Sequence, residues 1–291
     1  MTLPISTQLK KILVPLDFSE TSLHAMKYAA SLALKLNSEI VLFHTVGVPV
    51  VTSGDMVFTT DVSALQKDAI VQLEKAKAEL LNIDHKLNVS ISLAIGVPAN
   101  EINLKCKEDG IDLVIMGSDG TSGVIEVVFG SVTRSVIANC PCPVLTVPLN
   151  APNTFPGKVV FATNFDDHEL QPLFLLTEML KPLRTEIHLI HVDSTADMKS
   201  QDELLTYFRG QVTANINYDN IKFHLLKGDD VEDTIESFIV GNKIEWLAIA
   251  KRKRNFFDLV TSKSLTNKLH HHSYVPLLVF HTAVHSGTPL F

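Results

Sequence analysis

Three glycines and two hydroxyl residues follow an apolar run in the first half of the chain. They are Gly117, Gly120, Gly130, Ser131 and Thr133, and their pattern is G-x2-G-x9-G-S. Glycine-rich loops bring backbone N–H groups close to a ligand, and the free N–H groups that begin a helix attract anions. The two hydroxyls can cap such a helix and face a phosphate. The pattern therefore predicts a phosphate-binding loop, although it matches neither the Walker pattern nor the dinucleotide fingerprint.

The segments around this loop alternate between apolar runs and helical periodicity. Strands are expected at 12–15, 40–44, 89–94, 113–116 and 144–147, and helices at 21–36, 64–81, 100–108 and 131–139. The segment 47–63 is expected to be an irregular loop. Such alternation is typical of an α/β fold, a parallel sheet between two helical layers. The glycine loop then begins at the carboxyl edge of the sheet, where ligands bind in such folds.

The chain contains an internal repeat. KILVPLDFS at 11–19 returns as KVVFATNFD at 158–166, and IDLVIMG at 111–117 returns as IEWLAIA at 244–250. The proline-containing join LNAPNTFPG has the composition of a linker. We therefore expect two tandem domains, at 1–149 and 158–291, with a linker at 150–157.

The second copy lacks the glycines of the first. Ala250, Lys253 and Lys263 stand where the repeat places Gly117, Gly120 and Gly130, and Asn164 replaces Asp17. Side chains at these positions would occupy the space of a phosphate. We expect one site per chain, in the first copy. The basic segment KRKRNFF at 251–257 is interpreted as a solvated loop, with an anion site as the alternative.

Composition and charge exclude several classes of protein. The net charge of −7 is divided about evenly between the two halves, which argues against a nucleic-acid binder. No apolar stretch has the length of a membrane helix or signal peptide, so we expect a cytoplasmic protein without membrane contact. Three cysteines do not make a disulfide framework, and without a fourth ligand a zinc site is not expected.

Isolated histidines and cysteines are interpreted structurally. His44 lies within an apolar strand and is expected to be a core residue. Cys140 and Cys142 are expected to shape the start of the last strand of the first copy. The run 270–272 consists of histidines whose side chains would point in different directions on a helix, so no metal is assigned to it.

Five segments of the first copy resemble the universal stress protein family. They are KILVPLDFSETSLHAMKYAASLA (11–33), IVLFHTV (40–46), IGVPANEI (95–102), DLVIMGSDGTSGVIEVVFGSVTRSVI (112–137) and CPVLTVP (142–148). The ATP-binding members of that family carry G-x2-G-x9-G-[ST]. The resemblance implies two tandem three-layer α/β/α domains of the adenine nucleotide alpha hydrolase-like fold. It also implies a pseudo-dimer paired through 144–147 and 277–280, and it is compatible with a homodimer.

The resemblance also implies a set of site residues in the first copy. Pro15 and Asp17 would lie in the loop after the first strand, with Asp17 toward the ribose or adenine; its alternative role is to cap the helix that begins near Ser19. Ile40 would lie against the adenine. The floor and phosphate contacts would come from Met116, Gly117, Gly120, Gly130, Ser131, Val132 and Thr133. Mg²⁺ or Mn²⁺ would accompany ATP through its phosphate oxygens and water.

Binding is favoured over catalysis. The loop supplies only Asp119 and Glu126 as acids, and no basic residue precedes Arg134. Phosphoryl transfer depends on positive charges that stabilise the transition state. The expected function is a non-enzymatic, ATP-binding stress-response or signalling module with a protein partner that the sequence does not name. The alternative is a slow ATPase or another nucleotide-processing enzyme of a related fold.

Overall fold

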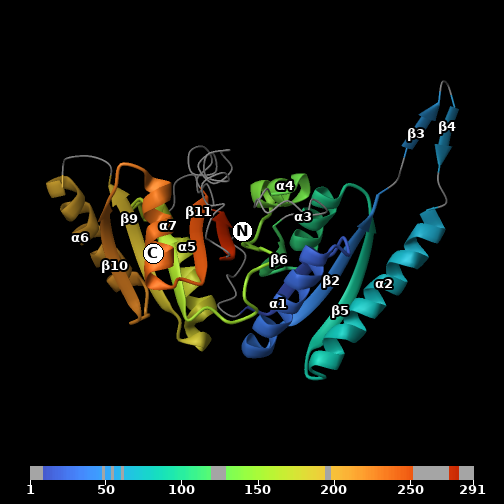
Figure 1. Ribbon diagram of the computed structural model, residues 1–291, viewed down its shortest axis with the longest axis horizontal. Helices are drawn as coiled ribbons and strands as arrows, with labels where there is room; N and C mark the ends of the chain where they lie inside the picture. Colours follow the sequence, from blue (N-terminus) through green and yellow to red (C-terminus); the bar gives the residue numbers. More distant parts are fainter. Residues whose placement is uncertain are drawn as a thin grey trace. The chain divides into compact units, whose positions relative to one another are not determined.

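The computed structural model describes residues 9–47, 50–53, 56–59, 62–118, 129–193, 198–251 and 275–281. These residues form two compact domains (Figure 1). The first domain contains the described residues up to Pro156 together with 275–278. The second domain contains those from Gly157 to 251 together with 279–281.

The first domain is built on five parallel strands in the order β7-β6-β1-β2-β5. The strands are β1 (Lys11–Pro15), β2 (Glu39–Val46), β5 (Asn88–Ile95), β6 (Leu113–Gly117) and β7 (Val144–Val147). The helices are α1 (Glu20–Leu36), α2 (Val62–Ile83), α3 (Pro98–Glu108) and α4 (Ser131–Asn139). These elements confirm the expected parallel α/β fold.

The order of the strands reverses direction at β1. The chain moves outward from β1 to β2 and β5, and then returns to the other side of β1 to form β6 and β7. Because parallel crossovers are right-handed, this reversal assigns α1 and α2 to one face of the sheet and α3 and α4 to the other. In agreement, α1 contacts α2, and α3 contacts α4 (Figure 1). Ligands in such sheets bind where the order reverses, which is the carboxyl edge between β1 and β6.

The core of the first domain follows from the apolar strands. All five residues of β6 are buried, as are the three central residues of β1. α1 begins at Glu20 because the side chain of Ser19 accepts a hydrogen bond from the amide of Ser22, and it ends at Asn37, whose left-handed conformation closes the helix.

The expectation of an irregular loop at 47–63 is wrong for two parts of that segment. β3 (Val50–Ser53) and β4 (Met56–Thr59) pair as antiparallel strands outside the main sheet. Both strands are rich in β-branched or aromatic residues, which favour extended backbone. The composition of the segment is therefore the missed signal. In the strand register, Val51 pairs with Phe58 and Thr52 with Val57.

The second domain repeats this plan. Its strands are β8 (Lys158–Ala162), β9 (Glu186–Asp193), β10 (Ile221–Lys227) and β11 (Trp246–Lys251), with β10-β9-β8-β11 as neighbours. Of β12 (Leu277–His281), residues 279–281 belong to this domain. Its helices are α5 (Leu170–Leu180), α6 (Met198–Asn215) and α7 (Val231–Asn242), with 3₁₀ turns η1 (Asp167–Glu169) and η2 (Lys181–Leu183). The described helices of both domains lack the combination of length and apolarity that crossing a bilayer requires.

Two side-chain arrangements recur in both domains. A carboxylate clamps the start of the first strand: Asp112 accepts hydrogen bonds from the amides of Lys10 and Lys11, each at 2.8 Å. Glu245 does the same for the amides of Gly157 and Lys158, at 2.5 and 3.0 Å. The repeat therefore extends from sequence to individual hydrogen bonds.

In the second recurring arrangement, a phenylalanine that follows the first strand of each domain packs on a histidine of the second strand. The ring centroids of Phe18 and His44 lie 4.7 Å apart, and those of Phe165 and His191 lie 4.8 Å apart. Both phenylalanines have positive φ, 65° and 59°. Since few residues other than glycine adopt such φ values without strain, the same tight turn is imposed twice.

The segment that was expected to be a linker packs against the first domain. The carbonyl oxygen of Ala151 lies 3.0 Å from Nε2 of His24, and Ser31 Oγ donates to Asn153 Oδ1 at 3.0 Å. Ala151 itself is buried. This segment is therefore anchored along α1.

Candidate functional site

A cavity of about 330 Å³ opens at the carboxyl edge of the first sheet. It lies where the strand order reverses, between the ends of β1, β2 and β6 and the start of α4. Eight of the ten residues expected at the site line it: Pro15, Asp17, Met116, Gly117, Gly130, Ser131, Val132 and Thr133. The volume falls at the lower end of the range for small-molecule sites.

The structure does not bring Ile40 to this cavity. Ile40 is completely buried near the amino end of β2, beside Ile12 of β1. Phe43, His44 and Thr45, at the carboxyl end of the same strand, line the cavity instead. Gly120 lies outside the described residues.

The start of α4 presents backbone amides without a side-chain cap. The N-cap residue is Gly130, and it has no side chain to accept hydrogen bonds from the first turn. The expectation that Ser131 caps this helix is therefore wrong, because Ser131 is already its first residue. The amides of Ser131, Val132 and Thr133 belong to the first turn, which carries the positive end of the helix dipole. All three residues line the cavity.

The hydroxyl of Thr133 has a structural partner. Its Oγ1 donates to the carbonyl oxygen of Gly117 at 3.2 Å, and the side chain is buried. The expectation that this hydroxyl donates to a ligand is therefore not met in the structure. Ser131, by contrast, is exposed and lines the cavity.

Gly117 is required by close packing. A Cβ atom there would lie 2.8 Å from Cγ2 of Thr21 and 3.3 Å from the amide nitrogen of Ser22. The last residue of β6 thus lies directly against the first turn of α1. A glycine at this position brings the two elements together at the floor of the cavity.

Asp17 is fixed within the loop that follows β1. Its Oδ1 accepts hydrogen bonds from the hydroxyl of Ser19 at 2.6 Å and from the amide of Ser19 at 3.0 Å. The N-cap of α1 is Ser19 itself, so Asp17 organises the cap rather than forming it. Burial raises the pKa of Asp17, but the hydrogen bonds from Ser19 and Ser22 outweigh burial and lower it overall. The side chain is therefore an ionised acceptor at neutral pH.

His44 also lines the cavity, which the sequence reasoning missed. Its Nδ1 lies 2.6 Å from the carbonyl oxygen of Leu16, and its ring packs on Phe18. The second domain keeps this pair, with Nδ1 of His191 2.8 Å from the carbonyl oxygen of Thr163. The primary role of His44 is therefore to hold the loop, as expected of a structural histidine. The sequence signal that could have placed His44 at the cavity was its position near the carboxyl end of the second strand.

The remaining walls of the cavity are largely apolar. They come from Leu16, Phe43, Pro98, Ile102 and Met116. Among the described lining residues, Asp17 is the only carboxylate, and no lysine or arginine is present. The arrangement suits a ligand with one flat or apolar part and one anionic part.

The corresponding loop of the second domain is closed by its own carboxylate. Glu169, which the repeat aligns with Ser22, is buried and accepts hydrogen bonds from the hydroxyl of Thr163 and the amides of Asn164 and Asp166. Burial raises the pKa of Glu169 despite these hydrogen bonds. Residues 167–169 form a 3₁₀ turn where the first domain begins α1. The amides of this loop are therefore engaged internally.

Comparison with known proteins agrees with the fold described above. The model of the Universal stress protein family matches residues 8–148. A universal stress protein of Methanocaldococcus jannaschii is 31% identical over 159 residues, which cover 49% of this chain and 97% of that protein. A universal stress protein of Bacillus subtilis is 32% identical over 146 residues and is covered to 97%.

Solved structures extend the likeness to both halves. The crystal structure of a universal stress protein from Archaeoglobus fulgidus matches with a TM-score of 0.72 at 19% identity, covering 94% of this chain and 99% of that one. One from Pseudomonas aeruginosa matches with a TM-score of 0.61 at 16% identity, covering 94% of each chain. At these identities the likeness concerns the fold.

Proposed function

Because this chain belongs to the universal stress protein family, we propose that its first domain binds one molecule of ATP in the cavity between β1, β6 and α4. The observation that carries the proposal is the uncapped start of α4 at the cavity wall. Three successive amides and the helix dipole form an anion site there, and Gly130 keeps it free of a competing side chain. The G-x2-G-x9-G-S motif supports the same assignment.

The two ends of the cavity differ chemically, and this difference sets the orientation of the bound ligand. The start of α4 lies beside β6 and would hold the phosphates. Asp17 and His44 lie at the ends of β1 and β2, on the other side of the reversal in strand order. An ionised carboxylate repels phosphate but accepts hydrogen bonds from a ribose hydroxyl or an adenine amino group. The nucleoside therefore lies toward β1 and β2.

A divalent cation would arrive with the nucleotide. The described cavity offers a single carboxylate, which is too few protein ligands for a dedicated site. Mg²⁺ in proteins is usually held by one or two carboxylates together with substrate phosphates and water. We propose that Mg²⁺ or Mn²⁺ is bound mainly through the triphosphate.

The site is suited to holding ATP rather than cleaving it. Neutral amides bind ground-state phosphate oxygens, whereas acceleration requires groups that bind the transition state more strongly. The described lining residues include no cation, and Asp17 is engaged by Ser19. A stress-response module whose surface changes with nucleotide occupancy fits these features. Slow hydrolysis driven by the metal ion is the alternative.

One ATP per chain is proposed, because residues with side chains replace the motif glycines in the second copy. In addition, Glu169 engages the amides of the loop that corresponds to the Asp17 loop. Calorimetry on the full chain tests both site and stoichiometry. Wild type should bind one ATP, and Gly130→Leu, whose apolar side chain would cover the first-turn amides of α4, should weaken binding at least about tenfold. Asp17→Ala should also weaken it.

Asn164→Ala is the matched control, since Asn164 occupies the position of Asp17 in the second domain. It should leave the affinity unchanged. If Gly130→Leu binds ATP within a factor of two of wild type, or if Asn164→Ala removes a second equivalent, the assignment of the site is wrong.

A further inference from the structure

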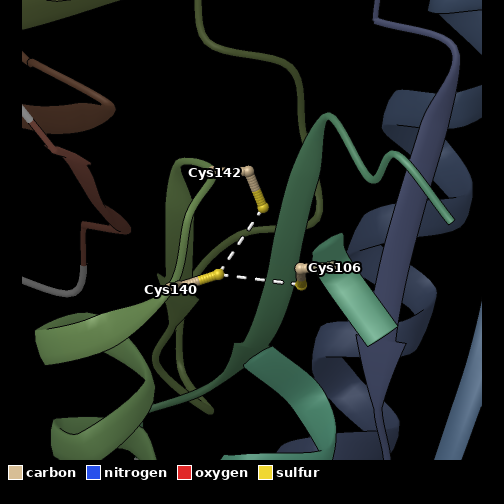
Figure 2. Close-up of side chains that lie close together, drawn as sticks. All are labelled: Cys106, Cys140 and Cys142. Atoms are coloured by element: carbon tan, nitrogen blue, oxygen red, sulfur yellow. Dashed lines mark hydrogen bonds between the residues drawn. The ribbon is translucent and has the colours of Figure 1, made fainter. Parts of the chain in front are cut away.

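The three cysteines of the chain meet in the core of the first domain, away from the cavity lining. Cys106 lies in the last turn of α3, Cys140 directly follows α4, and Cys142 precedes β7. Cys140 Sγ lies 3.5 Å from Cys142 Sγ and 3.7 Å from Cys106 Sγ, and all three sulfurs lie within 4.8 Å of one another. Figure 2 shows the three side chains close together, with Cys140 in contact with both Cys106 and Cys142.

From this cluster, we propose that Cys106, Cys140 and Cys142 form a binding site for a soft, thiophilic metal ion, specifically Cu(I). Three sulfurs arranged around one ion at about 2.3 Å would be separated by about 4 Å in a plane. The sulfurs already lie near that separation, so binding requires only small movements. The site is preorganised by α3 and α4, which pack against each other.

The kind of donor and the burial together select the metal. The cluster contains only sulfur donors, and all three cysteines are buried, with exposures of 3%, 2% and 8%. Structural zinc is almost always four-coordinate, whereas this cluster offers three protein ligands among the described residues. Cu(I) prefers thiolates and is stable with two or three of them. A three-thiol site closed to solvent therefore suits Cu(I) better than Zn²⁺.

The sulfurs are thiols before the metal binds. The hydrogen bond with Cys140 and burial raise the pKa of the Cys106 thiol. Hydrogen bonds with Cys106 and Cys140, together with burial, raise the pKa of the Cys142 thiol. Binding converts thiols to thiolates, and the displaced protons pass to solvent. The copper remains in the Cu(I) state throughout, so no oxidant or reductant takes part. Two sulfurs bind as thiolates and the third can coordinate as a thiol, which limits the negative charge that is buried.

The composition makes the test unusually direct. The chain has no other cysteine, so any copper–thiolate signal must come from this cluster. The full chain, reduced and kept free of oxygen, is titrated with Cu(I) in competition with the chromophoric chelator bicinchoninate. We expect one equivalent to be retained, with a near-ultraviolet thiolate-to-copper charge-transfer band. X-ray absorption of the wild-type complex should show two or three sulfur neighbours.

Serine variants then assign the ligands. Loss of a ligand should exceed the 10- to 100-fold effects of outer-shell partners, so Cys106→Ser and Cys140→Ser should each weaken Cu(I) binding at least about 100-fold. Ala99→Ser places a hydroxyl at another buried position of α3 and should retain copper. Circular dichroism verifies that each variant is folded, and the X-ray measurement on wild type does not depend on any variant.

Four results would overturn the proposal. The chelator could remove all copper from wild type, or the triple serine variant could retain one equivalent. A disulfide between two of the cysteines in the reduced-and-reoxidised chain, together with no copper binding by the reduced chain, would identify a redox pair instead. Tighter binding of Zn²⁺ than Cu(I) would reject the choice of metal.

Discussion

Thr133 Oγ1 donates a hydrogen bond to the carbonyl oxygen of Gly117 at 3.2 Å. This bond joins the first turn of α4 to the last residue of β6, and both residues line the cavity. It therefore fixes the amides of α4 relative to the floor on which a ligand would lie. A hydroxyl that the motif suggested as a ligand instead holds the anion site in place.

Replacing Thr133 with valine keeps the shape of the side chain and removes this hydrogen bond. We expect the free energy of unfolding to fall by about 1–3 kcal/mol, because a buried carbonyl group loses its partner. ATP affinity should fall as the start of α4 loosens. Urea unfolding and calorimetry measure the two effects. Ser131→Ala, at an exposed position, should alter stability by less than about 0.5 kcal/mol.

A substitution at Gly130 should be able to weaken ATP binding without lowering the stability of the protein. Its φ of −56° and ψ of 158° are accessible to any residue, so Gly130→Asp can cap α4. The capped helix should be at least as stable as wild type, whereas the carboxylate should compete for the amides and repel phosphate. We expect ATP binding to weaken at least about tenfold, while the thermal unfolding temperature is unchanged or raised.

Gly130→Asn is the control for charge in that experiment. Asparagine caps helices about as well as aspartate but is neutral. Its affinity for ATP should fall between those of wild type and Gly130→Asp. Equal affinity in all three proteins would show that α4 does not hold the phosphates.

The stability contributed by ionised Asp17 should depend on pH in the acid range. Since folding lowers the pKa of this carboxyl below its ordinary value of 3.8, the contribution is fully present above pH 3.8. It is lost as the pH falls through the lower pKa of the folded protein. Asp17→Asn retains a hydrogen-bond acceptor for Ser19 but has no charge. The difference in urea midpoint between wild type and this variant should be largest at neutral pH and should shrink below pH 3.8.

Gly117→Ala should destabilise the first domain through a steric contact with α1. The added Cβ would meet Cγ2 of Thr21 at 2.8 Å, so we expect a loss of about 1–3 kcal/mol. Thr21→Ser removes that methyl group while keeping the hydroxyl, and it should recover part of the loss in the double variant. Additive effects of the two substitutions would contradict the contact as the cause.

ATP should be hydrolysed slowly, if at all. The described lining residues place no cation beside the phosphates, so single-turnover rates with Mg²⁺ or Mn²⁺ should be far below roughly 1 s⁻¹, the low end of ordinary enzymes. Release of ADP is the measurement. A faster rate that is abolished by Asp17→Ala or Ser131→Ala would support the enzymatic alternative.

The sequence predicted the sheet and most of the cavity because both depend on patterns along the chain. Apolar runs mark β1 and β6, and the parallel fold brings their carboxyl ends together. The sequence could not place individual side chains at the carboxyl edge of the sheet. The hydroxyl of Thr133 donates to Gly117, and Ile40 lies three residues before Phe43, where β2 first lines the cavity. Such details depend on packing between elements.

Comparison of the two domains distinguishes residues that the fold requires from residues that the proposed ligand requires. Phe165 and His191 repeat the contact of Phe18 with His44, although the glycines of the motif are absent. Asp17 and Ser22, by contrast, become Asn164 and Glu169. The alignment of the two copies shows these substitutions, but the sequence could not reveal that the Glu169 carboxylate folds back onto the loop amides.

Helices α3 and α4 each touch both the cavity and the thiol cluster. Ile102 lines the cavity one helical turn before Cys106, and α4 runs from Thr133 at the cavity to Cys140. The binding free energies of two ligands at opposite ends of the same pair of helices are linked. Whatever factor ATP imposes on the affinity for Cu(I), Cu(I) must impose on the affinity for ATP. If both proposed ligands bind, this reciprocity would link the ATP level to the supply of a soft metal through a single chain.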